Sequence, residues 1–202
     1  MSEKTEKRRA DLRVRITDAA QAAVIEGGIE AVKARDLAKQ AGCALGAIYT
    51  VFDDRTDIIL AVNSRTFARL GQHVTNAVKA QSAKTPADQL IVMAKAYLEF
   101  AAANAFAWRT LFEIEMSTDK TVPDWYLDEM RRLLRLISEP LSQLRPTLPP
   151  EDISLLTRAM FSSVHGIVLL GLEKRISGVP SQDLNRMLET IIVNFSGAAH
   201  TI

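Results

Sequence analysis

The strongest constraint on the fold is the spacing of the apolar side chains, which recur at three- to four-residue intervals along almost the whole chain. This is the period of an amphipathic α-helix, whereas a half-buried strand alternates apolar and polar residues. No strand-like alternation stands out, and breaks such as Gly27-Gly28, Gly42 and Pro149-Pro150 separate the helical stretches. The sequence therefore predicts an all-α protein of about nine helices.

Short helices are predicted first and long ones later. The first helix should stop at Gly27-Gly28, and a fourth helix capped by Asp54, with Asp57 as its capping-box partner, should run to about Ala83. The other predicted helices lie at about 37–41, 45–51, 90–101, 104–116, from 123 until Pro140 kinks or ends the helix, 151–176 and 181–196, with a loop at 117–121. We expect a first domain over residues 1–54, with the start of the connecting helix reaching about 62. A second, larger helical domain should follow over 55–202.

Composition restricts the class of protein more than its partners. The 202 residues are 48% hydrophobic with a net charge of +1, so an argument for nucleic acid must rest on where the charges lie. The single cysteine, Cys43, forms neither an intrachain disulfide nor a metal cluster by itself. The polar N-terminus is unlike a signal peptide, and polar residues interrupt the apolar runs before the ~20 residues that span a bilayer. We expect a cytoplasmic protein without a membrane partner.

Residues 37–51 satisfy the requirements of a helix-turn-helix. Two helices that cross steeply need a small residue where they touch, which Ala38 supplies, and the turn needs a residue that tolerates positive φ, which Gly42 supplies. The inward-facing apolar anchors would be Leu37, Ala41, Cys43, Ile48 and Val51. From these spacings alone, an ordinary helical hairpin within a core remains the alternative.

The same stretch resembles a known family. Its glycine, tyrosine, phenylalanine and basic positions occur together in Arg35-Asp36-Leu37-Ala38, Gly42, Gly46-Ala47-Ile48-Tyr49, Phe52, Arg55 and Ile58. Together with Ala19-Ala20 and Glu26-Gly27-Gly28 upstream, the match covers about residues 13–62 and is with the N-terminal domain of the TetR family of bacterial transcription regulators. Beyond it, the chain is similar to the family in length and helical pattern, and Val164-His165-Gly166 resembles the His-Gly element of one subgroup.

The resemblance implies that residues 1–54 are a helix-turn-helix DNA-binding domain, called the head, and that residues 55–202 are a ligand-binding and dimerisation domain, called the body. It implies a homodimer with one head per subunit and a ligand pocket in the body. Occupancy of that pocket would alter the spacing of the two DNA-binding heads. It also places Tyr49 on phosphate or sugar, and the alternative role for Tyr49 is a half-buried wedge that holds the third helix. It favours a phosphate contact for Arg55, with a surface charge as the alternative. Family members usually carry Ser or Thr as N-caps at the positions that Lys33 and Ala44 occupy here.

Residues that would touch double-stranded operator DNA are few. Arg35 is the best base reader, because its guanidinium can bond guanine N7 and O6, although a salt bridge with Asp36 or Glu30 is the alternative. A basic N-terminal stretch, which includes Arg8 and Arg9, is either a phosphate-binding arm or a solvated tail. The predicted DNA contacts are Arg8, Arg9, Lys33, Arg35, Ala44, Leu45, Ala47, Tyr49, Thr50 and Arg55. The first sixty residues balance ten basic against ten acidic side chains, so binding should be modest and strongly salt-dependent.

Large soft side chains in the later helices suit an apolar effector, although each is individually typical of a core. The predicted ligand-binding residues are Phe67, Met93, Tyr97, Phe100, Trp108, Phe112, Trp125, Phe161 and His165, with His165, Tyr97 and Asn104 as the polar groups. Glycines inside a helix cost ~1 kcal/mol relative to alanine, which close packing against another helix offsets. The predicted dimer interface is Gly166, Leu170, Leu184, Leu188, Ile191 and Phe195.

The leading hypothesis is a sequence-specific transcriptional regulator, a repressor that a small, largely apolar effector releases from its operator. One alternative is an all-α enzyme, but His73, His165 and His200 are scattered and no nucleophile–base set or carboxylate cluster is present. We therefore expect no enzymatic activity, no cofactor and no metal. The other alternative is a helical dimeric adaptor without DNA binding. The basic N-terminal stretch and the helix-turn-helix argue against it.

Overall fold

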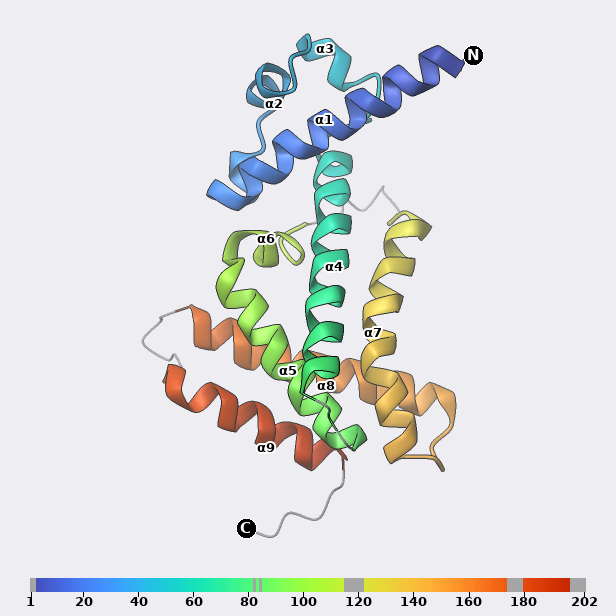
Figure 1. Cartoon of the computed structure of the whole chain (residues 1–202), viewed down its shortest axis with the longest axis vertical. Coiled ribbons are helices and arrows are strands. Elements are labelled where there is room, and N and C mark those ends of the chain that lie inside the picture. The colour runs from blue at the N-terminus through green and yellow to red at the C-terminus, as the bar shows by residue number, and fades with distance from the viewer. Residues whose placement is uncertain (1–2, 82, 84, 115–121, 174–179, 197–202) are drawn as a thin grey trace. The chain divides into compact units, whose positions relative to one another are not determined.

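The computed structural model describes residues 3–81, 83, 85–114, 122–173 and 180–196 (Figure 1). Across these residues the chain forms nine α-helices, two short 3₁₀-helices and no strand. This confirms the predicted all-α fold. The predicted loop at 117–121, the last residues of the helices predicted to end at 116 and 176, and His200 lie outside the described residues.

Spatial contacts divide the chain into two compact units, Met1–Ala68 with Asn104–Tyr126 and Arg69–Ala103 with Leu127–Ile202. The first boundary falls inside the long helix α4, so these units follow packing and do not test the functional division expected near residue 54. That division stays a prediction.

The first unit contains the short helices. They are α1 (Glu3–Gly27), η1 (Ile29–Ala31), α2 (Ala34–Gln40), α3 (Leu45–Ile48), the start of α4 (Arg55–Ala80) and α6 (Ala105–Thr110). α1 packs against α2 and α6. One buried cluster holds these helices together, with Ile16 and Val24 from α1, Leu37 from α2 and Ile48 from α3 each fully buried. The helical spacing of these residues in the sequence is therefore the spacing of one core.

Two local signals set helix ends as predicted. Gly28 follows α1 with φ of 68°, a left-handed conformation that glycine adopts without strain. Asp54 precedes α4, and its Oδ1 accepts a 3.0 Å hydrogen bond from the Asp57 amide. The Asp57 carboxylate accepts in turn from the amide of Asp53, one residue earlier than a regular capping box places it.

The second unit is built from long helices. They are the end of α4, α5 (Pro86–Ala103), most of α7 (Asp124–Leu144), α8 (Pro150–Leu172), the short η2 (Ser181–Asp183) and α9 (Leu184–Ser196). α9 packs against both α5 and α8, which lie beside it (Figure 1). The expectation that Pro140 ends or kinks its helix was wrong about the end, because α7 continues to Leu144. Pro140 and Leu141 are buried, and this packing offsets the hydrogen bond that a proline removes.

α8 is more apolar than the sequence reading allowed. An 18-residue window within Pro150–Leu172 has a mean hydropathy of 1.5, so by length and composition the helix could cross a membrane. The expectation that all apolar runs are too short missed this, because the polar residues that interrupt α8 are mostly uncharged. Core and interface helices of soluble proteins have the same composition, so this observation is weak evidence for a membrane.

Candidate nucleic-acid interface

α2, the Gly42 turn and α3 form the predicted helix-turn-helix. The turn closes on hydrogen bonds from the Ala41 amide to the Leu37 carbonyl at 2.8 Å and from the Cys43 amide to the Ala38 carbonyl at 3.0 Å. Gly42 has φ of 63°, which explains why a glycine stands there. Leu37 and Ile48 are fully buried, so the inward anchors lie as the sequence predicted.

The outward face of α3 is bare and made of small or apolar side chains. Leu45 is 41% exposed and Tyr49 is 55% exposed, and Ala44 and Gly46 are exposed as well. A Cβ placed on Gly46 would meet no atom within 4 Å, so space surrounds this position. A helix with such a face approaches another surface closely and offers apolar contacts rather than hydrogen bonds. The helix is shorter than predicted, ending at Ile48 instead of Val51.

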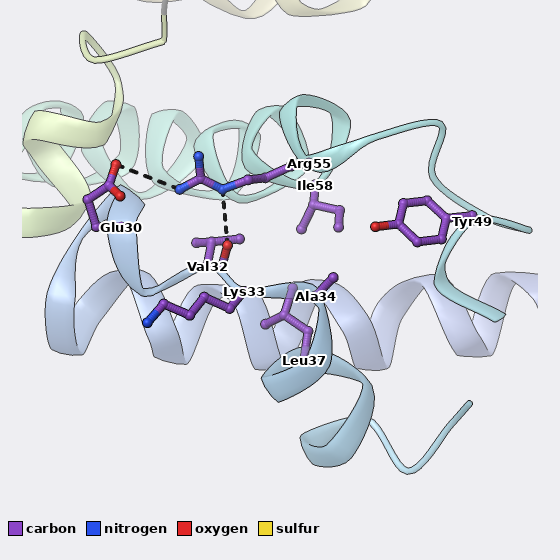
Figure 2. Close-up of a pocket in the computed structure, with 8 residues that line it drawn as sticks. All are labelled: Glu30, Val32, Lys33, Ala34, Leu37, Tyr49, Arg55 and Ile58. Carbon is purple, nitrogen blue, oxygen red and sulfur yellow. Dashed lines mark hydrogen bonds and ion pairs between the residues drawn. The ribbon is translucent and has the colours of Figure 1, made fainter. Parts of the chain in front are cut away.

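A groove of about 350 Å³ lies where α2, α3 and α4 meet (Figure 2). Val32, Ala34, Leu37 and Ile58 give it an apolar floor, and Glu30, Lys33, Tyr49 and Arg55 surround it. The Tyr49 hydroxyl points into the groove, whereas the Lys33 amine points away from Arg55 (Figure 2). Three of the residues predicted to touch DNA, Lys33, Tyr49 and Arg55, are thus brought to one place.

Arg55 is already bonded within the head. Its Nε donates to the Val32 carbonyl at 3.0 Å, its Nη2 donates to the Ile29 carbonyl, and Glu30 lies 3.9 Å away. These bonds tie the start of α4 to the segment before α2. The side chain keeps 49% of its surface exposed, so a phosphate contact stays a prediction beside this structural role.

Arg35 differs from Arg55. It is exposed on α2 and makes no hydrogen bond or ion pair with any described residue, so the alternative salt bridge with Asp36 or Glu30 does not form there. Its guanidinium is available to a partner outside the chain.

The N-terminal basic stretch is helical, because α1 begins at Glu3. Arg8 is exposed and unbonded among the described residues, but Arg9 donates to the carbonyl of Thr50. Arg13 and Arg15 donate to the carbonyls of Val51 and Ala41. Sequence reasoning missed these contacts, and the only signal for them was the four-residue spacing of Arg9 and Arg13.

The cap positions bear out the departure noted in the sequence. Lys33 and Ala44 occupy the N-caps of α2 and α3, and neither side chain makes a capping hydrogen bond. Thr50, another predicted DNA contact, is exposed, and its hydroxyl donates to the Ala47 carbonyl at 2.7 Å. The N-cap side chains therefore leave the first amides of both helices uncapped, and such amides are donors available to phosphate oxygens.

The residues predicted to bind a ligand fall into both compact units. In the first, Trp108 is buried against Phe112 with ring centroids 5.7 Å apart, Phe67 packs on Tyr126, and Phe112 and Trp125 are each 44% exposed. In the second lie Met93, Tyr97, Phe100, Phe161 and His165. No ligand is present, so a binding role for either set stays a prediction.

The polar group in the second set is the pair of Tyr97 and His165. The Tyr97 hydroxyl lies 2.8 Å from His165 Nδ1, and the Phe161 ring stacks on the imidazole. Burial lowers the pKa of His165 below its ordinary value of 6.5, so the neutral imidazole predominates at neutral pH. The pair is thus a polar spot among aromatic rings, of the kind that orients a largely apolar ligand.

The predicted dimer residues differ in how far the single chain buries them. Leu184 and Leu188 are 3% and 0% exposed within the single chain, so their side chains pack in its own core instead of facing a second copy. A Cβ on Gly171 would overlap Leu184, so the close contact between α8 and α9 explains why a glycine stands at this position. Leu170 is 48% exposed, and a Cβ placed on Gly166 would meet no atom within 4 Å. Ile191 and Phe195 on α9 are partly buried. The interface stays a prediction, and the exposed side chains favour α8 over the two buried leucines.

Two family models match the chain. Residues 16–62 match the model described as bacterial regulatory proteins, tetR family, and residues 90–195 match the tetracyclin repressor-like C-terminal domain. A curated relative, the HTH-type transcriptional regulator BetI of Yersinia pestis, is 25% identical over 182 residues, which cover 90% of this chain and 88% of BetI.

Solved structures share the fold. A protein with unknown function from Rhodococcus sp. RHA1 superposes with a TM-score of 0.71 at 21% identity, covering 92% of this chain and 94% of that one. The regulator FadR from Bacillus subtilis, solved in complex with stearoyl-CoA, has a TM-score of 0.61 at 17% identity and covers 93% and 99%. RolR, solved with resorcinol, has a TM-score of 0.68 at 17% identity and covers 98% of both chains.

Proposed function

The chain belongs to the tetR family of bacterial regulatory proteins and is a transcriptional regulator, and we propose that it is a repressor released from operator DNA by a small, largely apolar effector. The observation that carries the proposal is the arrangement of exposed side chains around α2 and α3. An exposed, small-residue α3 stands beside a groove that gathers Lys33, Tyr49 and Arg55, and Arg35 on α2 makes no bond with any residue that the structure describes.

The head divides the work of DNA binding among its residues. Lys33, Tyr49 and Thr50, with the uncapped amides at the starts of α2 and α3, contact the phosphate backbone, which supplies affinity but no sequence information. Arg35 reads a guanine edge in the major groove. Leu45 and Ala47 on α3 contact thymine methyl groups, and the small residues let the helix sit close to the bases.

The effector binds in the body of the protein. Its apolar part lies among the aromatic rings of the second unit, where the Tyr97–His165 pair supplies the polar contact. Two structural relatives hold ligands that combine an apolar part with polar groups, stearoyl-CoA and resorcinol. Their identities of 17% transfer no ligand to this chain, so only the broad chemical class is proposed. We propose that the protein has no enzymatic activity.

The protein acts as a homodimer through α8. Leu155, Ala159, Ser162, Gly166 and Leu170 follow each other at three- or four-residue spacing and therefore share one face. Leu155 is 68% exposed, and the small residues in the middle permit a close helix crossing. This face explains why so apolar a helix is largely uncovered in the single chain. The protein is then cytoplasmic, with α8 facing a second copy and not a bilayer.

Arg35→Ala tests the reading of DNA. Bound fragments are selected from the source genome with the wild-type protein and with the variant. The proposal predicts that one guanine position loses its preference in the variant, at a cost of about 1–3 kcal/mol for the missing bidentate pair. Equal weakening on every sequence would assign Arg35 to the backbone instead of the bases.

A further inference from the structure

Two arginines on one face of α1 hold the end of α3. Arg9 and Arg13 are four residues apart and so point in the same direction from the helix. Arg9 Nη2 donates to the Thr50 carbonyl at 2.6 Å, and Arg13 Nη1 donates to the Val51 carbonyl at 2.5 Å. The Arg13 guanidinium also lies over the Phe52 ring, 4.2 Å from its centroid. The two carbonyls are adjacent and lie two and three residues beyond the end of α3 at Ile48, so both bonds act on the turn that leads out of this helix.

α3 needs such support, because it has little of its own. The helix is four residues long, and helices much shorter than ~12 residues are marginal without tertiary contacts. Its N-cap, Ala44, makes no side-chain hydrogen bond. The amides of Thr50, Val51 and Phe52 already bond the carbonyls of α3, and the two guanidiniums donate to the next carbonyls along, which holds the turn that follows the helix.

The same chemistry recurs around the rest of the helix-turn-helix. Arg15, also on α1, donates to the Ala41 carbonyl at 2.8 Å, where α2 ends. Arg55 donates to the Val32 carbonyl just before α2 begins. Arginine side chains thus bond the backbone at both ends of α2 and beyond the end of α3.

We propose that Arg9 and Arg13 are positioning residues for DNA recognition, which fix α3 against α1 and do not themselves bind phosphate. This inference rests on the proposed function, because it assigns how the head presents α3 to DNA. It also changes the reading of the N-terminal basic stretch, in which Arg8 is available for phosphate while Arg9, the next residue, serves the fold. Arg8 points about 100° away from Arg9 around the helix and is the matched control.

The two roles differ in their salt dependence. Removal of one arginine that binds phosphate should reduce the slope of log K against log salt by about 0.9. Removal of a positioning arginine lowers affinity at every salt concentration and leaves that slope unchanged. Arg9→Ala and Arg8→Ala remove the same charge from neighbouring positions, so long-range electrostatics affect both variants alike.

The first experiment needs no DNA. Amide hydrogen exchange is measured on the free protein for Arg9→Ala, Arg13→Ala, Arg8→Ala and the wild type. We expect faster exchange at residues 47–52 in the first two variants, about tenfold or more, with α4 amides unchanged and Arg8→Ala like the wild type. Arg9→Lys, which keeps one donor, should recover part of the protection. Wild-type exchange at 47–52 in both Ala variants would overturn the proposal.

The second experiment measures affinity for an operator fragment recovered from genomic DNA, over a series of salt concentrations. Arg9→Ala and Arg13→Ala should each bind about tenfold more weakly, equivalent to about 1.4 kcal/mol, with the wild-type slope. A slope reduced by about one, or unchanged affinity, would overturn the proposal. If the wild-type protein binds no duplex, the proposed function fails, while the exchange data still decide whether the arginines hold α3.

Discussion

Leu170→Asp and Leu188→Ala separate the dimer face from the core. Leu170 lies on α8 and is 48% exposed, whereas Leu188 lies on α9 and is fully buried in the single chain. Both belong to the interface predicted from the sequence, but they differ in how far the single chain buries them. Leu170→Asp should weaken association and leave the fold intact. Leu188→Ala should destabilise the fold and leave association unchanged.

The expected magnitude for Leu170 follows from its exposure. Complete burial of a leucine side chain contributes about 1.5–3 kcal/mol, so the exposed half contributes about 0.7–1.5 kcal/mol when a partner covers it. A two-fold axis places the residue in the interface twice, which gives about 1.4–3 kcal/mol, or about 10- to 150-fold in the dimer dissociation constant. Desolvation of the aspartate adds to this loss.

Sedimentation equilibrium over a range of protein concentrations measures the dissociation constant, and thermal unfolding measures the fold. Leu188→Ala, which leaves a cavity, should lower the free energy of unfolding by about 2–5 kcal/mol. At temperatures where this variant stays folded, its dimer constant should match that of the wild type. A Leu170→Asp protein as dimeric as the wild type would refute the α8 interface.

Two further predictions concern the turn and the buried histidine. Gly42→Ala places a Cβ on a residue with φ of 63°, which should cost about 1–2 kcal/mol in thermal unfolding of the head, while Gly46→Ala, in open space, should cost nothing comparable; equal losses would show that the turn is not strained. Because burial lowers the pKa of His165, the unfolded chain binds more protons below pH 6.5, so the free energy of unfolding should fall as the pH drops through that value. His165→Gln should remove this part of the pH dependence, and an unchanged profile would assign the dependence to other groups.

Local signals in the sequence were sufficient for much of the head. Gly42 has the positive φ that its place in the turn indicated, and α1 ends at the predicted Gly27-Gly28 break. Asp54 caps α4 as its spacing with Asp57 predicted. These features depend on residues within a few positions of each other, which is the range over which turn and cap chemistry acts.

The features that the sequence could not reveal involve partners far apart in the chain. Arg9 and Arg13 bond carbonyls 41 and 38 residues away, and nothing local in the sequence distinguishes an arginine that binds carbonyls from one that binds phosphate. The spacing of Leu184 and Leu188 shows that α9 has an apolar face, but not whether that face meets its own chain or a second copy. Pro140 was expected to kink or end its helix, but α7 continues to Leu144, and propensity rules omit the burial that offsets the lost hydrogen bond.

Sequence-specific binding of double-stranded DNA is the central claim, and a competition experiment tests it most directly. The affinity of the wild-type protein for a fragment selected from the source genome is compared with its affinity for a scrambled duplex of equal length and composition, at near-physiological salt. We predict a ratio of about 10³ or more in favour of the selected fragment. A ratio near one would contradict the claim that this head reads an operator.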